Sequence, residues 1–155
     1  MATQNNGNGH TGIFQTLSME HEQVSQLFED VENTSGEDKE LREELFEKIK
    51  VELLAHAKAE DAVFYPALAQ HEKTKEIVGH ALEEHEEVKQ LLQELDGMSL
   101  GTQGFMQKLR KLKESVEHHV QEEEQKLFPK AQELLSKKES QALDEEYKER
   151  RAAES

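Results

Sequence analysis

The chain has 155 residues, of which 34% are charged and only two are proline, a composition typical of one helical domain. Its formal net charge of -15 argues against binding to nucleic acid or an anionic membrane through a bulk electrostatic field. The absence of cysteine excludes a disulfide framework, a thiolate metal site and a cysteine nucleophile.

The first half of the chain predicts a tail followed by two helices. Residues 1–12 are rich in Asn and Gly and have no apolar period, so we expect a disordered tail. Apolar residues at steps of three and four predict a helix over 13–32. A second stripe, which begins at Leu41, predicts a helix over 37–69 that Pro66 ends or kinks.

The second half repeats this plan and adds one segment. Apolar periodicity predicts helices over 75–96 and 105–130, separated by a glycine-containing loop over 97–104. The residues Ser136-Lys-Lys-Glu139 fit a capping box, which predicts a further helix within 136–155. We expect these helices to pack as an all-α bundle, and the short C-terminal helix to cover one of its ends.

Polar residues interrupt the apolar stripe of all four helices. Residues four apart lie on the same face of a helix, so each His-x3-Glu segment presents an imidazole beside a carboxylate. The interrupting residues are His21, the pair His56 and Glu60, His85, and the pair His119 and Glu123.

The interruptions belong to an internal repeat. The segment Glu-His21-Glu matches Glu-His85-Glu at an offset of 64, and the two His-x3-Glu segments match at an offset of 63. Helices one and two, and helices three and four, therefore represent two copies of one hairpin. Chance explains a single His-x3-Glu segment in a glutamate-rich chain much more readily than it explains six such residues at matching positions of a repeat.

A pair of divalent cations explains this pattern better than a set of core histidines hydrogen-bonded to neighbouring groups. Burying two carboxylates without a counter-charge costs several kcal/mol each, which bound cations offset. The other histidines have simpler interpretations: His10 in the tail, His71 in a connection, and His118 on a solvated face. His80 is most simply a solvated residue too, with an additional ligand to the metal or a contact with one of the ligands as its alternative roles.

Imidazole and carboxylate without thiolate suit Fe, Mn, Zn or Co. Two His-Glu pairs and two further histidines fit two ions better than one, with His21 and His56 on one ion and His85 and His119 on the other. Glu60 and Glu123 would bridge the ions. A structural zinc site is closed and four-coordinate, which this set does not naturally make, so redox-active iron is preferred. Phe64, Tyr65 and Phe128 are interpreted as packing residues, of which only Tyr65 has a hydroxyl that could reach the site, and no proton shuttle is recognisable.

The order of these residues on four helices resembles the hemerythrin-like (HHE cation-binding) domain family. The endings Phe-Tyr-Pro66 and Leu-Phe-Pro129 resemble the motifs of that family too, and the resemblance covers about residues 13 to 135. It implies that residues 13–135 form an up-down-up-down four-helix bundle whose core holds two non-haem iron ions with an oxo or hydroxo bridge. Members of the family bind or sense O2, sense iron or redox state, or decompose peroxide.

Two positions depart from the O2-carrying hemerythrins. Their third helix supplies two histidines four residues apart, whereas the earlier position here is Ala81. Their fourth helix carries an Asp five residues after the histidine, whereas Glu123 here follows His119 by four. The missing histidine implies an additional open coordination position, which favours reaction with peroxide over reversible O2 carriage.

The leading hypothesis is a di-iron protein that reacts with O2 or H2O2, with catalase-like peroxide decomposition as its candidate activity. The alternatives are a non-enzymatic protein that binds or senses O2, NO or iron, and a metal-free helical interaction protein. No apolar run reaches about 18 residues and no secretory signal is recognisable, so we expect no membrane association and a cytoplasmic location. No protein partner is identified.

Overall fold

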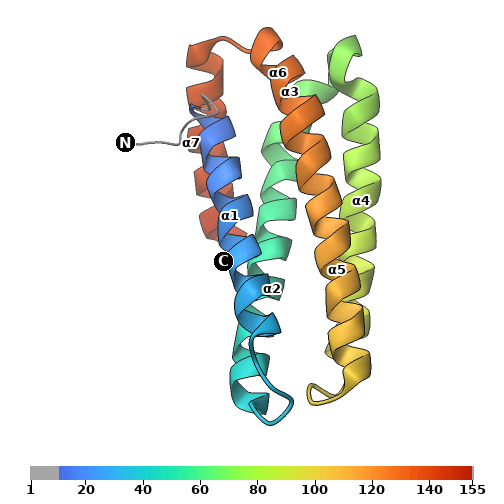
Figure 1. The fold of residues 1–155 in the computed structure, drawn as a ribbon. Coiled ribbons are helices and arrows are strands. Elements are labelled where there is room, and N and C mark those ends of the chain that lie inside the picture. The colour runs from blue at the N-terminus through green and yellow to red at the C-terminus, as the bar shows by residue number, and fades with distance from the viewer. Residues whose placement is uncertain (1–10, 155) are drawn as a thin grey trace.

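Four long antiparallel helices form the body of the protein in a computed structural model that describes residues 11–154 (Figure 1). They are α1 (Ile13–Glu32), α2 (Lys39–Ala59), α4 (Glu72–Asp96) and α5 (Gln103–Glu122). Successive helices run in opposite directions, which confirms the predicted up-down-up-down bundle. The Thr102 side chain accepts a hydrogen bond of 3.2 Å from the Phe105 N–H and caps the start of α5.

The helices that carry the two His-x3-Glu segments each contain a π-helical turn. Helix α2 continues through η1 (Glu60–Phe64) into α3 (Tyr65–Ala69), and α5 continues through η2 (Glu123–Leu127) into α6 (Phe128–Leu134). A proline inside an α-helix clashes with the carbonyl four residues earlier, and the wider π turn lies directly before this position in both helices. The predicted kink at Pro66 is thus a π turn that starts at the glutamate.

The last helix, α7 (Lys137–Glu154), begins with the predicted capping box. The Ser136 Oγ accepts a hydrogen bond from the Glu139 N–H at 3.1 Å, and a Glu139 oxygen accepts one from the Ser136 N–H at 2.9 Å. The expectation that this helix covers an end of the bundle is wrong, because α7 runs along the side of the bundle against α1 and α2 (Figure 1). Gly12, at φ 58°, permits this contact, since a Cβ there would lie 2.5 Å from the Ser140 Oγ.

The apolar core consists of two clusters with a polar layer between them. One cluster contains Val24, Leu53, Val88 and Val116, and the other contains Leu17, Ala59, Ala81 and Leu127. On each of the four long helices, a polar interruption of the stripe lies between a residue of the first cluster and one of the second. The fold therefore places these polar residues at one level of the bundle.

The start of α2 differs from the predicted stripe. Leu41 is 48% exposed, whereas the neighbouring Arg42 is buried at 4% exposure. The Arg42 guanidinium donates hydrogen bonds to the Leu100 carbonyl at 2.7 Å and to the Thr34 hydroxyl at 3.0 Å. It thereby joins the two loops at this end, and hydrogen bonds with these partners offset the burial of its charge.

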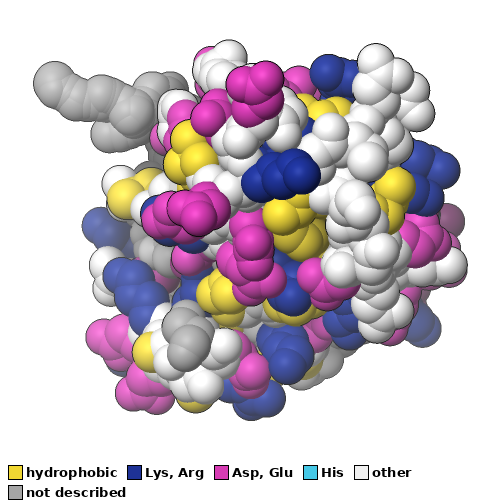
Figure 2. Space-filling view, turned by 90° about the horizontal axis from the view of Figure 1, so that it is seen from below, with side chains coloured by type: hydrophobic (Ala, Val, Ile, Leu, Met, Phe, Trp, Pro, Cys, Tyr) yellow, Lys and Arg dark blue, Asp and Glu magenta, His cyan; other side chains and the backbone are white. Residues whose placement is uncertain are grey.

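The surface carries charges of both signs at the end where the loops 33–38 and 97–102 lie. Figure 2 shows this end with Lys and Arg interspersed among Asp and Glu and small apolar areas between them. The net negative charge is therefore not gathered into one acidic face there. Within residues 11–154, none of the helices combines the length and apolarity needed to cross a membrane.

Candidate metal centre

The structure brings the six polar residues of the apolar stripes into one buried layer. Each is at most 9% exposed: His21, His56, Glu60, His85, His119 and Glu123. The Nε2 atoms of all four histidines point towards the two carboxylates. The Nε2 atoms of His56 and His85 lie 3.1 and 3.2 Å from Glu60 Oε1. Those of His21 and His119 lie 3.1 and 3.5 Å from oxygens of Glu123.

The six residues form two overlapping groups, in each of which the ligand atoms are close enough together to bind one metal ion. His21, His56, Glu60 and Glu123 each offer a ligand atom within 4.8 Å of the others, as do Glu60, His85 and His119. Glu60 belongs to both groups, so it has the position of a bridging carboxylate. Two ions sharing a carboxylate in the core of a helical bundle is a common arrangement in proteins that hold a pair of metals.

Several polar atoms of this layer make no hydrogen bond of suitable geometry, although three of them lie in the ion pairs given above. They are His21 Nε2, His56 Nε2, Glu60 Oε2 and Glu123 Oε1, all of them buried. Buried polar atoms are rarely left in this state, because each costs free energy comparable to a lost hydrogen bond. Nitrogen and oxygen atoms that converge in this way fit divalent cations of the first transition row, so the residues present suit the predicted metal pair.

The opposite nitrogen of every ring, Nδ1, contacts a carboxylate. The four pairs are Glu20 with His56 (2.8 Å), Asp61 with His85 (2.8 Å), Glu84 with His119 (2.8 Å) and Glu124 with His21 (2.6 Å). An ionised carboxylate only accepts hydrogen bonds, so Nδ1 is the donor in each pair. This fixes the orientation of each ring and leaves Nε2 directed at the centre, as in metal-binding histidines generally.

These four carboxylates, which we call the carboxylate ring, link neighbouring helices around the bundle. The Glu20 carboxylate joins α1 to α2, and the Asp61 carboxylate joins η1 to α4. The Glu84 carboxylate joins α4 to α5, and the Glu124 carboxylate joins η2 back to α1. The ring therefore closes on itself, and every helix that carries a histidine also takes part in holding the histidine of a neighbour.

Sequence reasoning missed the carboxylate ring, although a signal for it was present. Each of its members is adjacent in sequence to one of the six central residues, as in the pair Glu20-His21 and the pair Glu123-Glu124. The members also follow the internal repeat, because Glu20 matches Glu84 at an offset of 64 and Asp61 matches Glu124 at 63. The repeat thus extends beyond the apolar stripe.

The metal-free layer stabilises positive charge on His21 and His85. Burial opposes protonation of His21, but hydrogen bonds with Glu123 and Glu124 outweigh it and raise its pKa to about 9. Burial is likewise outweighed at His85, where Asp61 and Glu60 raise the pKa to about 9. Protons therefore occupy these imidazoles in the absence of metal, and a bound cation would replace them.

Two tyrosine hydroxyls complete the layer. Tyr65 is 1% exposed, and its hydroxyl donates a hydrogen bond to Glu123 Oε2 and lies 3.2 Å from Glu60 Oε1. Burial and these two carboxylates raise the Tyr65 pKa well above its usual range, so the hydroxyl keeps its proton. Tyr147 reaches the other side of the layer from α7 and donates to Glu20.

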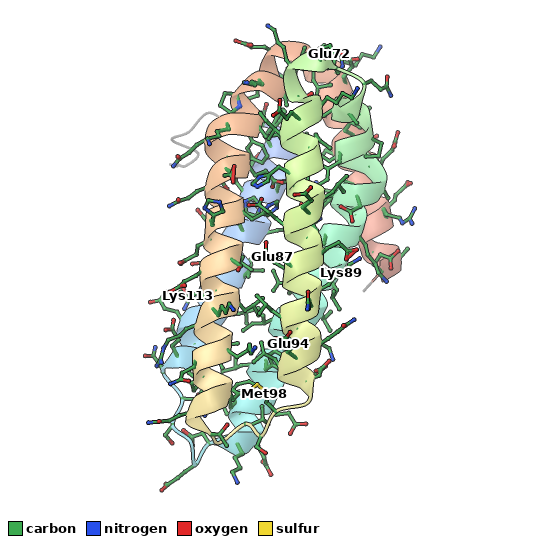
Figure 3. All side chains as sticks on the ribbon, turned by 90° about the vertical axis from the view of Figure 1, so that its right-hand side faces the viewer. Glu72, Glu87, Lys89, Glu94, Met98 and Lys113 are labelled. Carbon is green, nitrogen blue, oxygen red and sulfur yellow. The ribbon has the colours of Figure 1, made fainter. Side chains whose placement is uncertain are left out.

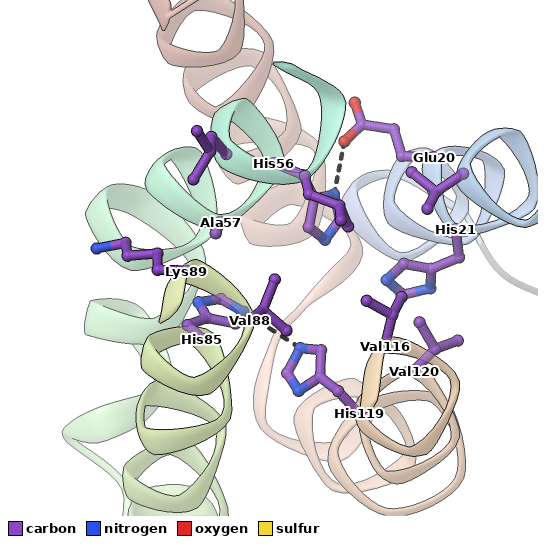
Figure 4. Close-up of a pocket in the computed structure, with 13 residues that line it drawn as sticks. Glu20, His21, His56, Ala57, His85, Val88, Lys89, Val116, His119 and Val120 are labelled. Atoms are coloured by element: carbon purple, nitrogen blue, oxygen red, sulfur yellow. Dashed lines mark hydrogen bonds and ion pairs between the residues drawn. The ribbon is translucent and has the colours of Figure 1, made fainter. Parts of the chain in front are cut away.

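A small cavity opens against the histidines on the side of the layer away from the π turns (Figure 4). Its volume is about 40 Å³. All four central histidines line it, together with apolar side chains that include Val24, Leu53, Val88, Val116 and Val120. The cavity therefore offers a small molecule an apolar space directly beside the Nε2 atoms.

The remaining histidines lie outside this layer. His80 and His118 are exposed on α4 and α5, where they contact Glu84 and Glu122 and not the central carboxylates. His71 lies directly before α4, and His10 lies outside the described residues. The suggestion that His80 supplies an additional ligand to the centre is therefore wrong, because its ring points to the outer face of the bundle.

Comparison with known proteins agrees with this architecture. The model of the hemerythrin HHE cation-binding domain matches residues 12–131. A crystal structure of a hemerythrin HHE cation-binding domain-containing protein from Mycobacterium kansasii superposes with a TM-score of 0.82. That match covers 94% of this chain and 88% of the other at 24% sequence identity, so it supports the fold alone.

Two curated relatives are longer than this chain. A protein named DNA nickase from Nostoc sp. is 29% identical over 149 residues, which are 94% of this chain and 41% of that protein. An uncharacterized hemerythrin-like protein from Schizosaccharomyces pombe is 27% identical over 132 residues, which are 84% of this chain and 64% of the relative. The chain thus spans less than two thirds of either relative.

Proposed function

Because this chain belongs to the hemerythrin HHE cation-binding domain family, we propose that its buried layer holds two non-haem iron ions and reacts with O2 or hydrogen peroxide. His21 and His56 would hold one ion, and His85 and His119 the other. Glu60 and Glu123 would be shared between them. Iron held in this way supplies a redox couple between Fe(II) and Fe(III), which is the chemistry that both small molecules require.

The observation that carries this proposal is the apolar cavity beside the histidines. Its volume of about 40 Å³ corresponds to roughly three water-sized spheres, which suits a molecule of two oxygen atoms and excludes most organic substrates. Apolar walls favour entry of O2, and the imidazoles provide the polar side of the space. A purely structural metal site has no need of such a space.

The side chains around the layer support peroxide decomposition as the candidate activity. Disproportionation of hydrogen peroxide to O2 and water moves protons as well as electrons. The protonated Tyr65 hydroxyl lies within hydrogen-bonding distance of both shared carboxylates, where it can donate a proton and recover it. The sequence alone offered no such proton donor.

The test is metal analysis combined with peroxide turnover. Protein purified from iron-replete cells is expected to contain two irons per chain and to evolve O2 from added peroxide. The variant His119→Ala is expected to lose di-iron binding and turnover, whereas His71→Ala, a histidine in the α3–α4 connection, retains both. Retention of two irons per chain by His119→Ala would contradict the assignment.

The alternative is a non-enzymatic protein that binds or senses O2, NO or iron. A stable spectrum of the O2-bound protein without turnover supports this alternative over the enzyme. A sensor needs a surface for its output, for which the charged last helix α7 is a candidate. Tyr147 is fully buried against α1 and α2, which argues against that use of α7.

The buried convergence of four imidazoles and two carboxylates argues against the third hypothesis, a metal-free interaction protein, because apolar side chains would stabilise such a bundle without burying charge. The activity named in the Nostoc relative, DNA nicking, is not proposed for this chain. Its net charge of -15 opposes contact with phosphate backbones, and it covers only 41% of the relative with that name.

A further inference from the structure

A second cluster of histidines and carboxylates lies on the outer face of α4 and α5, the pair of helices nearest the viewer in Figure 3. It repeats the spacing of the buried layer, because His80 precedes Glu84 by four residues and His118 precedes Glu122 by four. Unlike the buried histidines, these are open to solvent, with side chains 50% and 64% exposed. We call these four residues the outer cluster.

The distances within the outer cluster are those of a cation site. The His118 Nε2 lies 2.9 Å from Glu122 Oε1 and 3.5 Å from Glu84 Oε2. The His80 Nδ1 lies 3.4 and 3.9 Å from the same two oxygens. Ligand atoms about 2.1 Å from a tetrahedral ion lie roughly 3.4 Å from one another. The ligand atoms of His80, Glu84 and Glu122 all lie within 4.8 Å of one another, and His118 contacts the same two oxygens from α5.

Glu84 connects the outer cluster to the buried layer. Its Oε2 faces the two outer histidines, whereas its Oε1 accepts the hydrogen bond of 2.8 Å from His119 Nδ1. One carboxylate thus belongs both to the outer cluster and to the carboxylate ring. A cation bound to the Glu84 carboxylate would therefore lie between the outer histidines and the buried layer, so its transfer inward would require little movement of the backbone.

A small cavity lies between the outer cluster and the buried layer. Its volume is about 10 Å³, which is close to the space of a single water-sized sphere. Its walls include His80, Glu84 and Glu122 on the outside and His119 and Glu123 on the inside. Glu123 is 2% exposed, and its Oε1 is one of the buried atoms without a hydrogen-bond partner.

Ala81 also lines this cavity. Its methyl side chain leaves room between the outer cluster and the buried layer.

We propose that the outer cluster is an exchangeable divalent-cation site through which Fe(II) enters the buried centre. Imidazole and carboxylate suit Fe(II), Zn(II) and Co(II) alike, and solvent exposure of both histidines favours rapid exchange. The net charge of -15 raises the local concentration of cations at the surface. The entry role rests on the proposed function, whereas the outer site itself does not.

The outer site is tested with Zn(II) on protein whose buried centre has been loaded beforehand. Calorimetry is expected to show one further Zn(II) per chain. The double variant His80→Ala/His118→Ala leaves Glu84 and its bond to His119 in place, and it is expected to bind this ion at least about tenfold more weakly. His71→Ala is the matched control and retains it. Equal Zn(II) binding by the double variant and the parent would overturn the site.

The entry role is tested by the rate of Fe(II) uptake into metal-free protein under anaerobic conditions. The double variant is expected to fill about tenfold more slowly but to reach the same final iron content. Ala81→Val, which narrows the cavity and leaves the outer cluster intact, is expected to slow uptake without loss of the outer Zn(II). A parental rate in both variants, or a lower final content in the double variant, contradicts entry by this path. A parent that takes up no iron but still binds the outer Zn(II) contradicts the proposed function and the entry role, and leaves the outer site standing.

Discussion

Tyr147 of α7 donates a hydrogen bond of 2.5 Å to Glu20 of α1, and its hydroxyl lies 3.1 Å from the Nδ1 of His56. Glu20 is the member of the carboxylate ring that orients His56. The last helix therefore takes part in positioning a residue of the buried layer, although it lies outside the four-helix bundle.

Replacing Tyr147 with Phe tests this contribution to stability. The ring keeps its packing, but Glu20 loses a buried donor, so we expect the free energy of unfolding to fall by about 1–2 kcal/mol. Urea unfolding of metal-free protein measures the change. A double-mutant cycle with Glu20→Gln is expected to be non-additive, and strictly additive values would show that the two side chains act independently.

The carboxylate ring is expected to control metal affinity without contacting metal. Asp61→Asn removes the charge beside the Nδ1 of His85, so the imidazole becomes a weaker ligand and iron affinity falls by about tenfold or more. Competition with a chelator measures the affinity. Asp30→Asn, on α1 and outside the ring, is the matched control. Equal retention of iron by both variants would show that the ring has only a structural role.

Filling the apolar cavity is expected to slow the reaction and leave the metal in place. Val88 lines the cavity and is 8% exposed, so Val88→Phe directs a larger side chain into the space beside the histidines. We expect the rate of reaction with O2 or peroxide to fall by about tenfold, because an increase of about 1.4 kcal/mol in the activation free energy is sufficient for that change. Val51→Phe on the exposed face of α2 is the control. Stopped-flow absorbance gives the rates, and unchanged kinetics in Val88→Phe would contradict a role for the cavity.

Tyr65→Phe separates proton delivery from metal binding. The variant keeps the ring but removes the hydroxyl that contacts Glu60 and Glu123, so we expect turnover of peroxide to fall by about 100-fold. Iron content is expected to stay at the parental value. If peroxide turnover is unchanged, the hydroxyl is not the proton donor; if iron is lost, its role is structural.

The stability of the metal-free protein is expected to fall as pH rises above neutrality. The pKa values of His21 and His85 are raised from 6.5 to about 9, so their contribution to stability is complete below about pH 6.5 and lost as pH rises through 9. On the acid side, burial of Glu60 is outweighed by His56 and His85, which lower its pKa, so its contribution is lost as pH falls below 4.5. Stability is therefore greatest between about pH 4.5 and 6.5.

Denaturant unfolding of chelator-stripped protein from pH 4 to 9 tests this profile. Iron binding is expected to show the opposite trend, with affinity rising over pH 6–9 as the cation displaces protons from the imidazoles. Metal-free protein of equal stability at pH 6.5 and 9 would show that the buried histidines are neutral throughout.

The bundle and the convergence of the central residues were predictable because helical periodicity fixes which side chains share a face. His21 lies between Leu17 and Val24 on the stripe of α1, and the same holds for the polar interruptions of the other three helices. Once four stripes meet in one core, residues at the same level of each must lie close together.

The π turns and the position of α7 were not predictable in the same way. A His-x3-Glu segment places its two side chains on one face in an ordinary α-helix too, so the spacing of His56 and Glu60 contains no sign of the wider turn. The carboxylate ring was hidden for a different reason, because its members are among 34 acidic residues in the chain. Their adjacency to the central residues distinguishes them only after those residues are known.

The position of α7 makes the two halves of the internal repeat unequal. It packs on α1, α2 and η1, so it covers the side of the buried layer that carries His21 and His56. On the opposite side, the cavity beside the outer cluster reaches His119. The pseudo-twofold symmetry of the hairpins is thus broken by a helix that has no counterpart on the opposite side. Two ions bound in this layer would differ in how readily they leave, and stepwise chelation should remove the ion at His85 and His119 first.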